Sequence, residues 1–241
     1  MFWGIVVGSA AVLVVTFLVV ALTLGLHQAG VIRSLSGPSW KRIVPIYNLV
    51  TTIVFYAAML GAVLLFAARG GVRGVWSRLG LIRPPFWVIP LMVPLAVALQ
   101  LFTGVMSSVL SPLLGGMSNP QGCDISSGFG TDPLLGVLAI AVIAPVVEEI
   151  TFRGFVYGGL RTRMGVTWAV VISSAVFAVA HSLSVGGSIV LLAPSLFVAG
   201  VALALVYERT RSLYPGIALH ASFNAVAVAL IFLTSTAANC R

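Results

Sequence analysis

The chain has 241 residues, of which 60% are apolar and only 7% are charged, and its mean hydropathy is +1.14. Because about a quarter of the residues in an ordinary soluble domain are charged, this composition excludes a water-soluble globular protein. The formal net charge is +8, from 13 Lys and Arg residues against five acids. The basic residues stand almost entirely between apolar runs, so they indicate contact with membrane lipid headgroups rather than with nucleic acid.

Apolar runs long enough to cross about 30 Å of hydrocarbon as helices recur along the chain. Transmembrane helices are predicted at 3–27, 44–68, 86–111, 133–160, 166–184, 187–207 and 213–236. None of these runs alternates with the period that a membrane β-barrel requires. The sequence therefore predicts an all-α polytopic membrane protein with about seven transmembrane helices, in which the last four carry the polar chemistry.

This distribution of polar residues divides the chain in two. We predict a variable N-terminal region at 1–131, made of three helices and an outer loop, and a functional core of four helices at 132–241. The sequence gives no indication of oligomeric state.

The basic residues also predict an orientation. The loops on one side hold eight of them: Arg69, Arg73, Arg78, Arg83, Arg161, Arg163, Arg209 and Arg211. The other side holds four: Arg33, Lys41, Arg42 and Arg241. The positive-inside rule then favours a cytoplasmic N-terminus. The composition, with one Lys and many Ala, Val and Gly residues, is typical of a GC-rich bacterial or archaeal genome, hence of an inner or plasma membrane. This topology places Cys123 and Cys240 on the same outer face, where a disulfide is a hypothesis.

Two of the five acids, Glu148 and Glu149, are adjacent within an apolar run. An ionisable group at membrane depth costs at least a few kcal/mol and usually marks function. Glu149 and Arg153 are spaced i, i+4 and can pair on one helix, whereas Glu148 points about 100° away and has no local partner. A buried polar clamp between helices is the alternative, and it weighs more for Glu149 and Arg153 than for Glu148.

Two histidines and an asparagine are predicted to lie near this acidic pair. The turn between the fourth and fifth helices falls near 164–165, with Glu148 and His181 each about 16 residues, or about 24 Å, from it. An antiparallel hairpin therefore brings these two residues to the same depth. His220 and Asn224 share one face of the last helix because they too are spaced i, i+4.

Such a set of side chains suits hydrolysis. A glutamate can deprotonate water with the help of a histidine, while a second histidine and an amide stabilise an oxyanion. Equally, Glu148, His181 and His220 are zinc-ligand types, which would leave the second glutamate as a base. Spacing alone leaves both readings open, and the sequence contains no HExxH motif and no Gly-rich phosphate loop.

Three motifs in order resemble the CAAX prenyl protease type II family, also described as the CPBP or Abi family of intramembrane proteases. EExxxR, FxxxH and HxxxN begin at Glu148, Phe177 and His220. The resemblance covers 136–232 and implies the following six site positions: Glu148, Glu149, Arg153, His181, His220 and Asn224.

The resemblance also implies a role for each position and a class of partner. Glu148 and His181 would activate water, His220 and Asn224 would stabilise the oxyanion, and Glu149 with Arg153 would orient the helix or support Glu148. Members are described both as metal-dependent and as metal-free, so the cofactor stays open; metal-free catalysis is favoured, with zinc held by Glu148, His181 and His220 as the alternative. The expected partner is a membrane-associated peptide or protein, including lipidated, CAAX-like ones.

Two other classes of function remain as alternatives. A noncatalytic immunity or assembly factor with the same fold would require a blocked pocket or glutamates locked in salt bridges. A proton-coupled transporter would use the same acids and histidines as a relay. Against a transporter, the polar groups cluster in one patch and the chain has no inverted repeat.

Overall fold

The structure is a computed structural model that describes residues 38–68, 74–116, 121–184 and 189–233. This described part is helical and contains no strand, as an all-α membrane protein requires. Five segments are long and apolar enough to cross a membrane: Arg42–Ala67, Phe86–Leu113, Pro133–Ser182, Val190–Thr210 and Leu213–Leu233. The prediction of a polytopic all-α fold is confirmed. The count of seven is not, because the predicted helix at 3–27 lies outside the described residues.

The element bounds agree with the predicted spans to within a few residues. In chain order they are α2 (Pro38–Ala67), α3 (Val75–Arg78), η3 (Phe86–Val88), α4 (Met92–Leu113), α5 (Gln121–Phe129), α6 (Pro133–Val137), η4 (Leu138–Ile143), α7 (Ala144–Glu149), η5 (Ile150–Tyr157), α8 (Gly158–Ser184), α9 (Ile189–Thr210) and α10 (Leu213–Leu233). The short helices α3 and α5 fall in segments that the sequence predicted as loops. Hydropathy over the length of a membrane span could not detect them, since α3 has four residues and α5 has nine, several of them polar.

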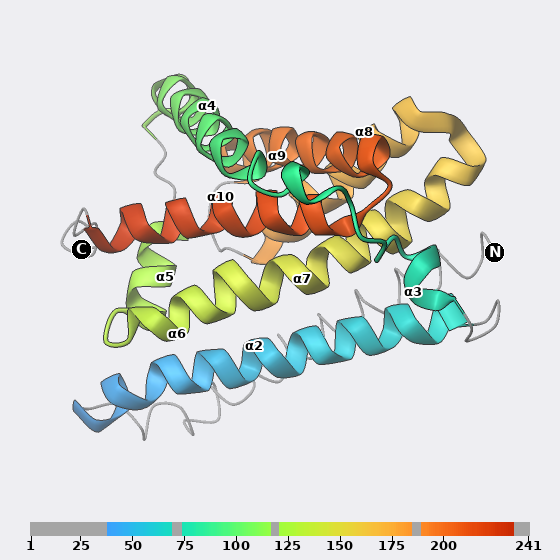
Figure 1. The fold of residues 1–241 in the computed structure, drawn as a ribbon. Coiled ribbons are helices and arrows are strands. Elements are labelled where there is room, and N and C mark those ends of the chain that lie inside the picture. The colour runs from blue at the N-terminus through green and yellow to red at the C-terminus, as the bar shows by residue number, and fades with distance from the viewer. Residues whose placement is uncertain (1–37, 69–73, 117–120, 185–188, 234–241) are drawn as a thin grey trace.

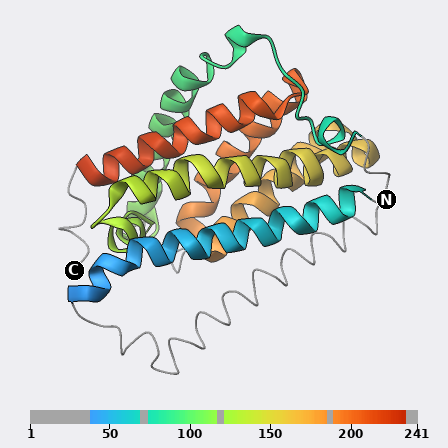
Figure 2. The same ribbon diagram turned by 60° about the horizontal axis from the view of Figure 1, so that its bottom comes forward.

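The segment that carries the adjacent glutamates lies in the middle of the bundle. Helix α2 runs along one side of the continuous segment α6–η4–α7–η5, and α10 runs along its other side (Figures 1 and 2). Helices α8 and α9 pack closely against each other, and α4 packs against α9 and α10. Any polar side chain of α7 is therefore surrounded by other helices.

One glycine interrupts the helical backbone of α8. Gly165 has φ 77° and ψ −179°, a conformation that is not helical and that side chains with a Cβ rarely adopt. The two helical arms on either side of it are the predicted fourth and fifth spans, and the predicted turn near 164–165 is confirmed at this glycine.

The loop between α3 and η3 is fastened to the turn between α9 and α10. Leu213 donates its backbone N–H to the Gly80 carbonyl at 2.8 Å, and Ser212 Oγ donates to the Ile82 carbonyl at 2.6 Å. Gly80 has φ 89°, and a Cβ there would lie 2.6 Å from the ring of Tyr207, so only glycine fits. These contacts fix the segment between α2 and α4 to the turn between α9 and α10.

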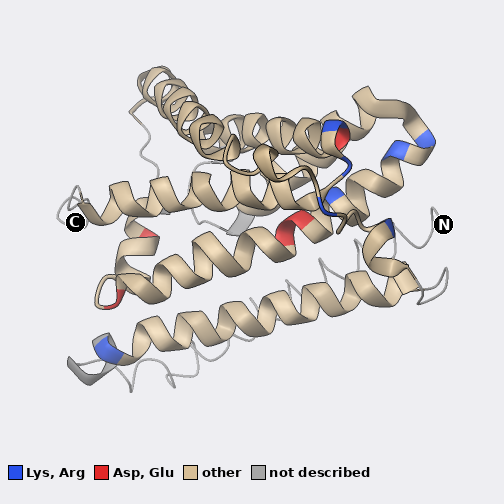
Figure 3. Ribbon diagram, in the orientation of Figure 1, with Lys and Arg blue, Asp and Glu red and all other residues tan. Residues whose placement is uncertain are grey.

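Apart from Glu148, Glu149 and Arg153, the described charged residues lie towards the two ends of the bundle. At one end Glu208 accepts hydrogen bonds from Arg211 at 2.7 Å and Tyr157 at 2.5 Å, and Arg161 pairs with it at 3.3 Å. Figure 3 shows most of the Lys and Arg colour at this end, which agrees with the predicted grouping of basic loops.

The opposite end of the bundle carries α5 and the start of α6. There Asp132 caps α6 by accepting from the Leu135 N–H at 3.4 Å. Cys123 on α5 is disulfide-bonded. The chain contains one other cysteine, Cys240, and the predicted partner therefore lies outside the described residues.

Candidate active site

The adjacent acids sit at the C-terminal end of α7, between two π-helical runs. Glu148 is 4% exposed and Glu149 is fully buried. The preceding run is η4 and the following one is η5. Because π-helical turns are rare and are often found at functional sites, their presence on both sides of a buried acid pair singles out this part of the helix.

Glu149 belongs to a buried ion pair, as the i, i+4 spacing predicted. Arg153 Nη1 donates to Glu149 Oε1 at 2.8 Å, and both side chains are almost completely buried. The second guanidinium nitrogen donates to the Gly200 carbonyl at 3.2 Å, which links η5 to α9. His220 Nδ1 lies 2.9 Å from the same Oε1 atom, and it donates, because an ionised carboxylate can only accept.

Glu148 has no partner on its own helix but has partners from three others. His181 Nε2 on α8 lies 3.1 Å from its Oε2, and His220 Nε2 on α10 lies 3.7 Å from the same atom. Its Oε1 accepts a hydrogen bond from the Tyr56 hydroxyl on α2. Each carboxylate oxygen of Glu148 therefore faces a different kind of partner, with a phenol on one side and two imidazoles on the other.

The contact of the other imidazole nitrogen, Nδ1, shows that Glu148 and His181 share a proton. His181 Nδ1 lies 2.9 Å from the Phe177 carbonyl, which can only accept, so Nδ1 carries a proton. Nε2 and Oε2 then approach to 3.1 Å, and two bare acceptors would repel each other at that distance. One further proton is therefore shared by this pair.

The Phe177 ring packs against three of these polar side chains. The Phe177 ring lies 4.2 Å from the His181 ring and 5.8 Å from the His220 ring, between centroids. The Arg153 guanidinium carbon stands 4.6 Å from the centre of the same ring, a cation–π arrangement. Phe152 contacts Phe177 edge-on at 5.1 Å. The phenylalanine of the FxxxH motif thus fixes both imidazoles.

Asn224 reaches the same helix segment at another point. Its Nδ2 donates to the Ile140 carbonyl at 2.8 Å. In η4 the Ala144 N–H bonds to the Ala139 carbonyl, five residues earlier, so the corresponding donor for Ile140 would be residue 145. That residue is Pro145, which has no N–H. Asn224 therefore satisfies a carbonyl that the π-helical register and the proline leave without a backbone donor.

The structure brings five of the six predicted site residues into direct contact. Glu148 with His181 and His220 forms one group, and Glu149 with Arg153 and His220 forms the other, so His220 joins them. Asn224 bonds to the backbone of the same segment rather than to a site carboxylate. Tyr56 was not predicted. Its only signal in the sequence is a hydroxyl in the middle of an apolar run.

The zinc alternative requires Glu148, His181 and His220 to be arranged around one metal ion. Within the part of the chain that the structure describes, no group of three or more His, Cys, Asp or Glu side chains is arranged to hold a metal ion. Glu148 Oε2 is in direct contact with His181 Nε2, and Glu149 is taken by Arg153.

Residues 130–226 match the family model of Type II CAAX prenyl endopeptidase Rce1-like proteins. On this similarity we call residues 130–226 the Rce1-like domain. The matched range contains all six predicted site positions and the interacting Phe177, so the resemblance read from the three motifs is confirmed. No curated protein and no solved structure matches the chain. The five apolar helical segments and this similarity together indicate a multi-pass membrane protein.

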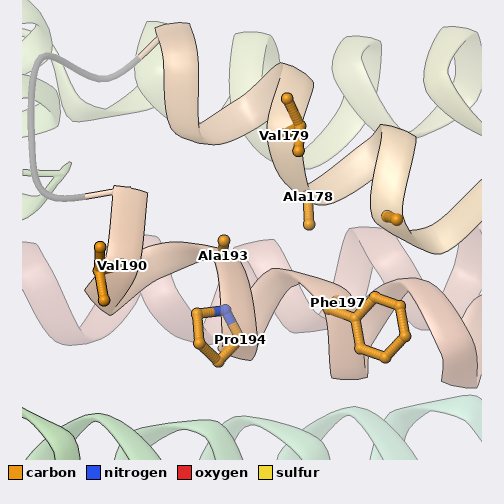
Figure 4. Close-up of a pocket in the computed structure, with 7 residues that line it drawn as sticks. Ala178, Val179, Val190, Ala193, Pro194 and Phe197 are labelled. Atoms are coloured by element: carbon orange, nitrogen blue, oxygen red, sulfur yellow. The ribbon is translucent and has the colours of Figure 1, made fainter.

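A shallow apolar groove lies between α8 of the Rce1-like domain and α9. Its volume is about 460 Å³. Figure 4 shows side chains of the two helices facing each other across it. The lining residues are Ala175, Ala178, Val179, Val190, Ala193, Pro194 and Phe197. None of them is ionisable, so the groove suits an apolar chain.

A close contact in the Rce1-like domain leads to a first prediction. A Cβ on Gly216 of α10 would lie 3.0 Å from Glu149 Oε2. Glu149 cannot yield easily, because Arg153 and His220 hold its other oxygen. Gly216→Ala is expected to lower the free energy of unfolding in detergent by about 1–3 kcal/mol, as overpacking of a filled interior does.

The matched control is Gly104→Ala on α4, where a Cβ would meet nothing within 4 Å. That exchange replaces a helical glycine with alanine in open space and is expected to leave stability unchanged or raise it by up to about 1 kcal/mol. Equal behaviour of the two variants would contradict the tight packing of Gly216 on Glu149.

Proposed function

We propose that this protein is an intramembrane endopeptidase that hydrolyses a peptide bond of a membrane-associated peptide or protein, with lipidated, CAAX-like peptides as the first substrate class. The observation that carries the proposal is the buried Glu148–His181 pair, 3.1 Å apart, with His220 on the same carboxylate oxygen. The family match supports the reaction class, and the site supplies the general base that the reaction needs.

Glu148 acts as the base that activates water. With the shared proton on His181, Glu148 is an ionised carboxylate. A water molecule beside Oε2 transfers a proton to Glu148 while its oxygen forms a bond to the carbonyl carbon of the scissile peptide. The carbonyl oxygen becomes the oxyanion of a tetrahedral intermediate. As the intermediate collapses, the carbon–nitrogen bond breaks, Glu148 returns its proton to the leaving nitrogen, and the products are a carboxylic acid and an amine.

His220 and Asn224 stabilise the oxyanion in this proposal. Glu149 holds His220 through Nδ1, so that Nε2 points to the region of Glu148 Oε2, 3.7 Å away. Protonated there, His220 donates towards the developing charge. Asn224 uses one amide hydrogen for the Ile140 carbonyl and keeps the second for the substrate. Glu149 and Arg153 support the site by fixing His220 and the helix that bears Glu148.

Access to the site is through His181, whose side chain is 26% exposed while that of Glu148 is 6% exposed. Water and a peptide bond can therefore approach from the α8 side. The groove suits the apolar part of a lipidated or membrane-embedded substrate. We further propose a prokaryotic cell membrane as the location, with the arginine-rich end and the N-terminus on the cytoplasmic side.

The test is cleavage of a quenched fluorescent peptide with a lipidated cysteine by purified protein, with and without a chelator. Wild type is expected to cleave in both conditions, and Glu148→Gln is expected to lose about a thousandfold in turnover. Glu208→Gln is the matched control: it removes a carboxylate from the remote Tyr157 and Arg161 network and is expected to remain active.

Each other result points to a different alternative. Cleavage that the chelator abolishes would favour the metalloenzyme. Absence of cleavage in wild type, with lipidated and unmodified peptides alike, would favour the noncatalytic membrane factor. Equal activity of wild type and Glu148→Gln would reject Glu148 as the base.

A further inference from the structure

One contact of the candidate site comes from outside the Rce1-like domain. The Tyr56 hydroxyl of α2 donates to Glu148 Oε1, across 92 positions of sequence. The family model begins at residue 130, so this contact is not part of what the family match covers. Tyr56 is also the one non-histidine side chain that bonds to Glu148 among the described residues.

The position of Tyr56 is held at several points along α2. Near one end of the helix, Asn48 Nδ2 donates to the Gly128 carbonyl of α5 at 3.0 Å. Towards the other end, Val63 is 1% exposed and belongs to the core cluster that contains Ile150 and Tyr157 of η5. Met59, three residues after Tyr56, is 4% exposed. Helix α2 is thus fixed on both sides of Tyr56, and this holds the hydroxyl next to Glu148.

Because of this contact, the two Glu148 carboxylate oxygens have different partners. The terminal torsion of a glutamate is broad and does not by itself fix the carboxylate plane. With Oε1 held by Tyr56, Oε2 must face His181 and His220. The Tyr56 hydroxyl gives a hydrogen bond to a charged group in a low-dielectric setting, which is among the stronger kinds. Without it, the carboxylate can rotate and Oε1 would be left with no donor among the described side chains.

We propose that Tyr56 is a positioning residue of the reaction centre, which holds the Glu148 carboxylate so that Oε2 faces the histidines and the attacking water. Helix α2 is then part of the active site, although it lies outside the matched domain. This inference rests on the proposed function, in which Glu148 is the base.

The first test compares kcat and KM for wild type, Tyr56→Phe, Tyr214→Phe and Glu148→Gln on the same fluorescent peptide. Tyr56→Phe keeps the ring and loses the hydroxyl, and its kcat is expected to fall about ten- to a hundredfold, as for the loss of a hydrogen bond to a charged group. KM is expected to stay within about threefold, because Tyr56 binds Glu148 rather than substrate. Tyr214, which is 41% exposed, is the matched control and is expected to match wild type.

A second measurement does not depend on activity. Unfolding of wild type, Tyr56→Phe, Glu148→Gln and the double variant forms a double-mutant cycle. If the hydroxyl binds the carboxylate, Tyr56→Phe is expected to lower the free energy of unfolding more in the wild-type background than in the E148Q background. Additive effects would overturn the inference, as would a Tyr56→Phe kcat within twofold of wild type or a rise in KM alone.

The two failures can be told apart. If wild type and E148Q cleave equally, or neither cleaves, the proposed function fails. The unfolding cycle then still decides whether Tyr56 holds Glu148: coupled effects support the contact and additive effects reject it. If wild type cleaves, E148Q does not and Tyr56→Phe is unaffected, the function stands and the role of Tyr56 is rejected.

Discussion

The double variant Glu148→Gln, His181→Gln is expected to turn over substrate no more slowly than either single variant. Each single exchange is expected to reduce kcat about a thousandfold, within the range for loss of general acid–base catalysis. The two side chains share one proton across 3.1 Å, so removing either one disables the same proton transfer. Residues that act as a unit give effects that do not multiply.

Single-turnover rates of the four proteins measure this directly. Independent roles for the two residues would make the double variant about a millionfold slower than wild type, the product of the two single effects. That product, or a His181→Gln variant with nearly full activity, would show that the pair does not act as one base. Chromatographic behaviour and helical circular dichroism equal to wild type would show that the variants are folded.

The sequence predicted the helical membrane fold because the relevant forces are local and averaged. Length and hydropathy of a run decide whether it can span a bilayer, and both can be read from consecutive residues. The turn at Gly165 was predicted from its flanking arginines, since charged residues leave the hydrocarbon. The short helices α3 and α5 were not predicted. With four and nine residues, they are too short to give a signal in a hydropathy average over the length of a membrane span.

The predicted site also followed from simple geometry. The i, i+4 spacing of Glu149 and Arg153 produced the ion pair that it predicts. Equal distances of Glu148 and His181 from the turn produced their contact, because helical rise converts residue counts into depth. Motif order added His220, which spacing alone could place only roughly. These inferences succeeded where one helix or one hairpin determines the distance.

The parts that could not be predicted depend on contacts between distant elements. Nothing in the α2 sequence says that Tyr56, rather than Tyr47, faces Glu148, because the packing of α2 on η4 and η5 decides it. The π-helical register of η4 is likewise invisible in the sequence, and so is the vacant Ile140 carbonyl that Asn224 satisfies. Both features arise from the tertiary structure around a functional helix.

Arg153→Met is expected to lower the free energy of unfolding by about 3–5 kcal/mol, the usual effect of breaking a buried ion pair from one side. The guanidinium donates to Glu149 and to the Gly200 carbonyl, and it lies over the Phe177 ring. Removing it leaves a fully buried carboxylate with His220 as its remaining partner. Equilibrium unfolding in mixed micelles measures the loss.

Two further variants show whether charge or shape is responsible for that loss. Adding Glu149→Gln to Arg153→Met is expected to restore part of the stability, because a neutral amide oxygen can still accept from His220 without leaving a charge buried alone. Arg161→Met removes an arginine whose side chain is 33% exposed and whose pairing with Glu208 is open to solvent, and it is expected to change stability little. If Arg153→Met behaved like Arg161→Met, the Glu149–Arg153 pair would not be the element that holds the glutamate helix in place.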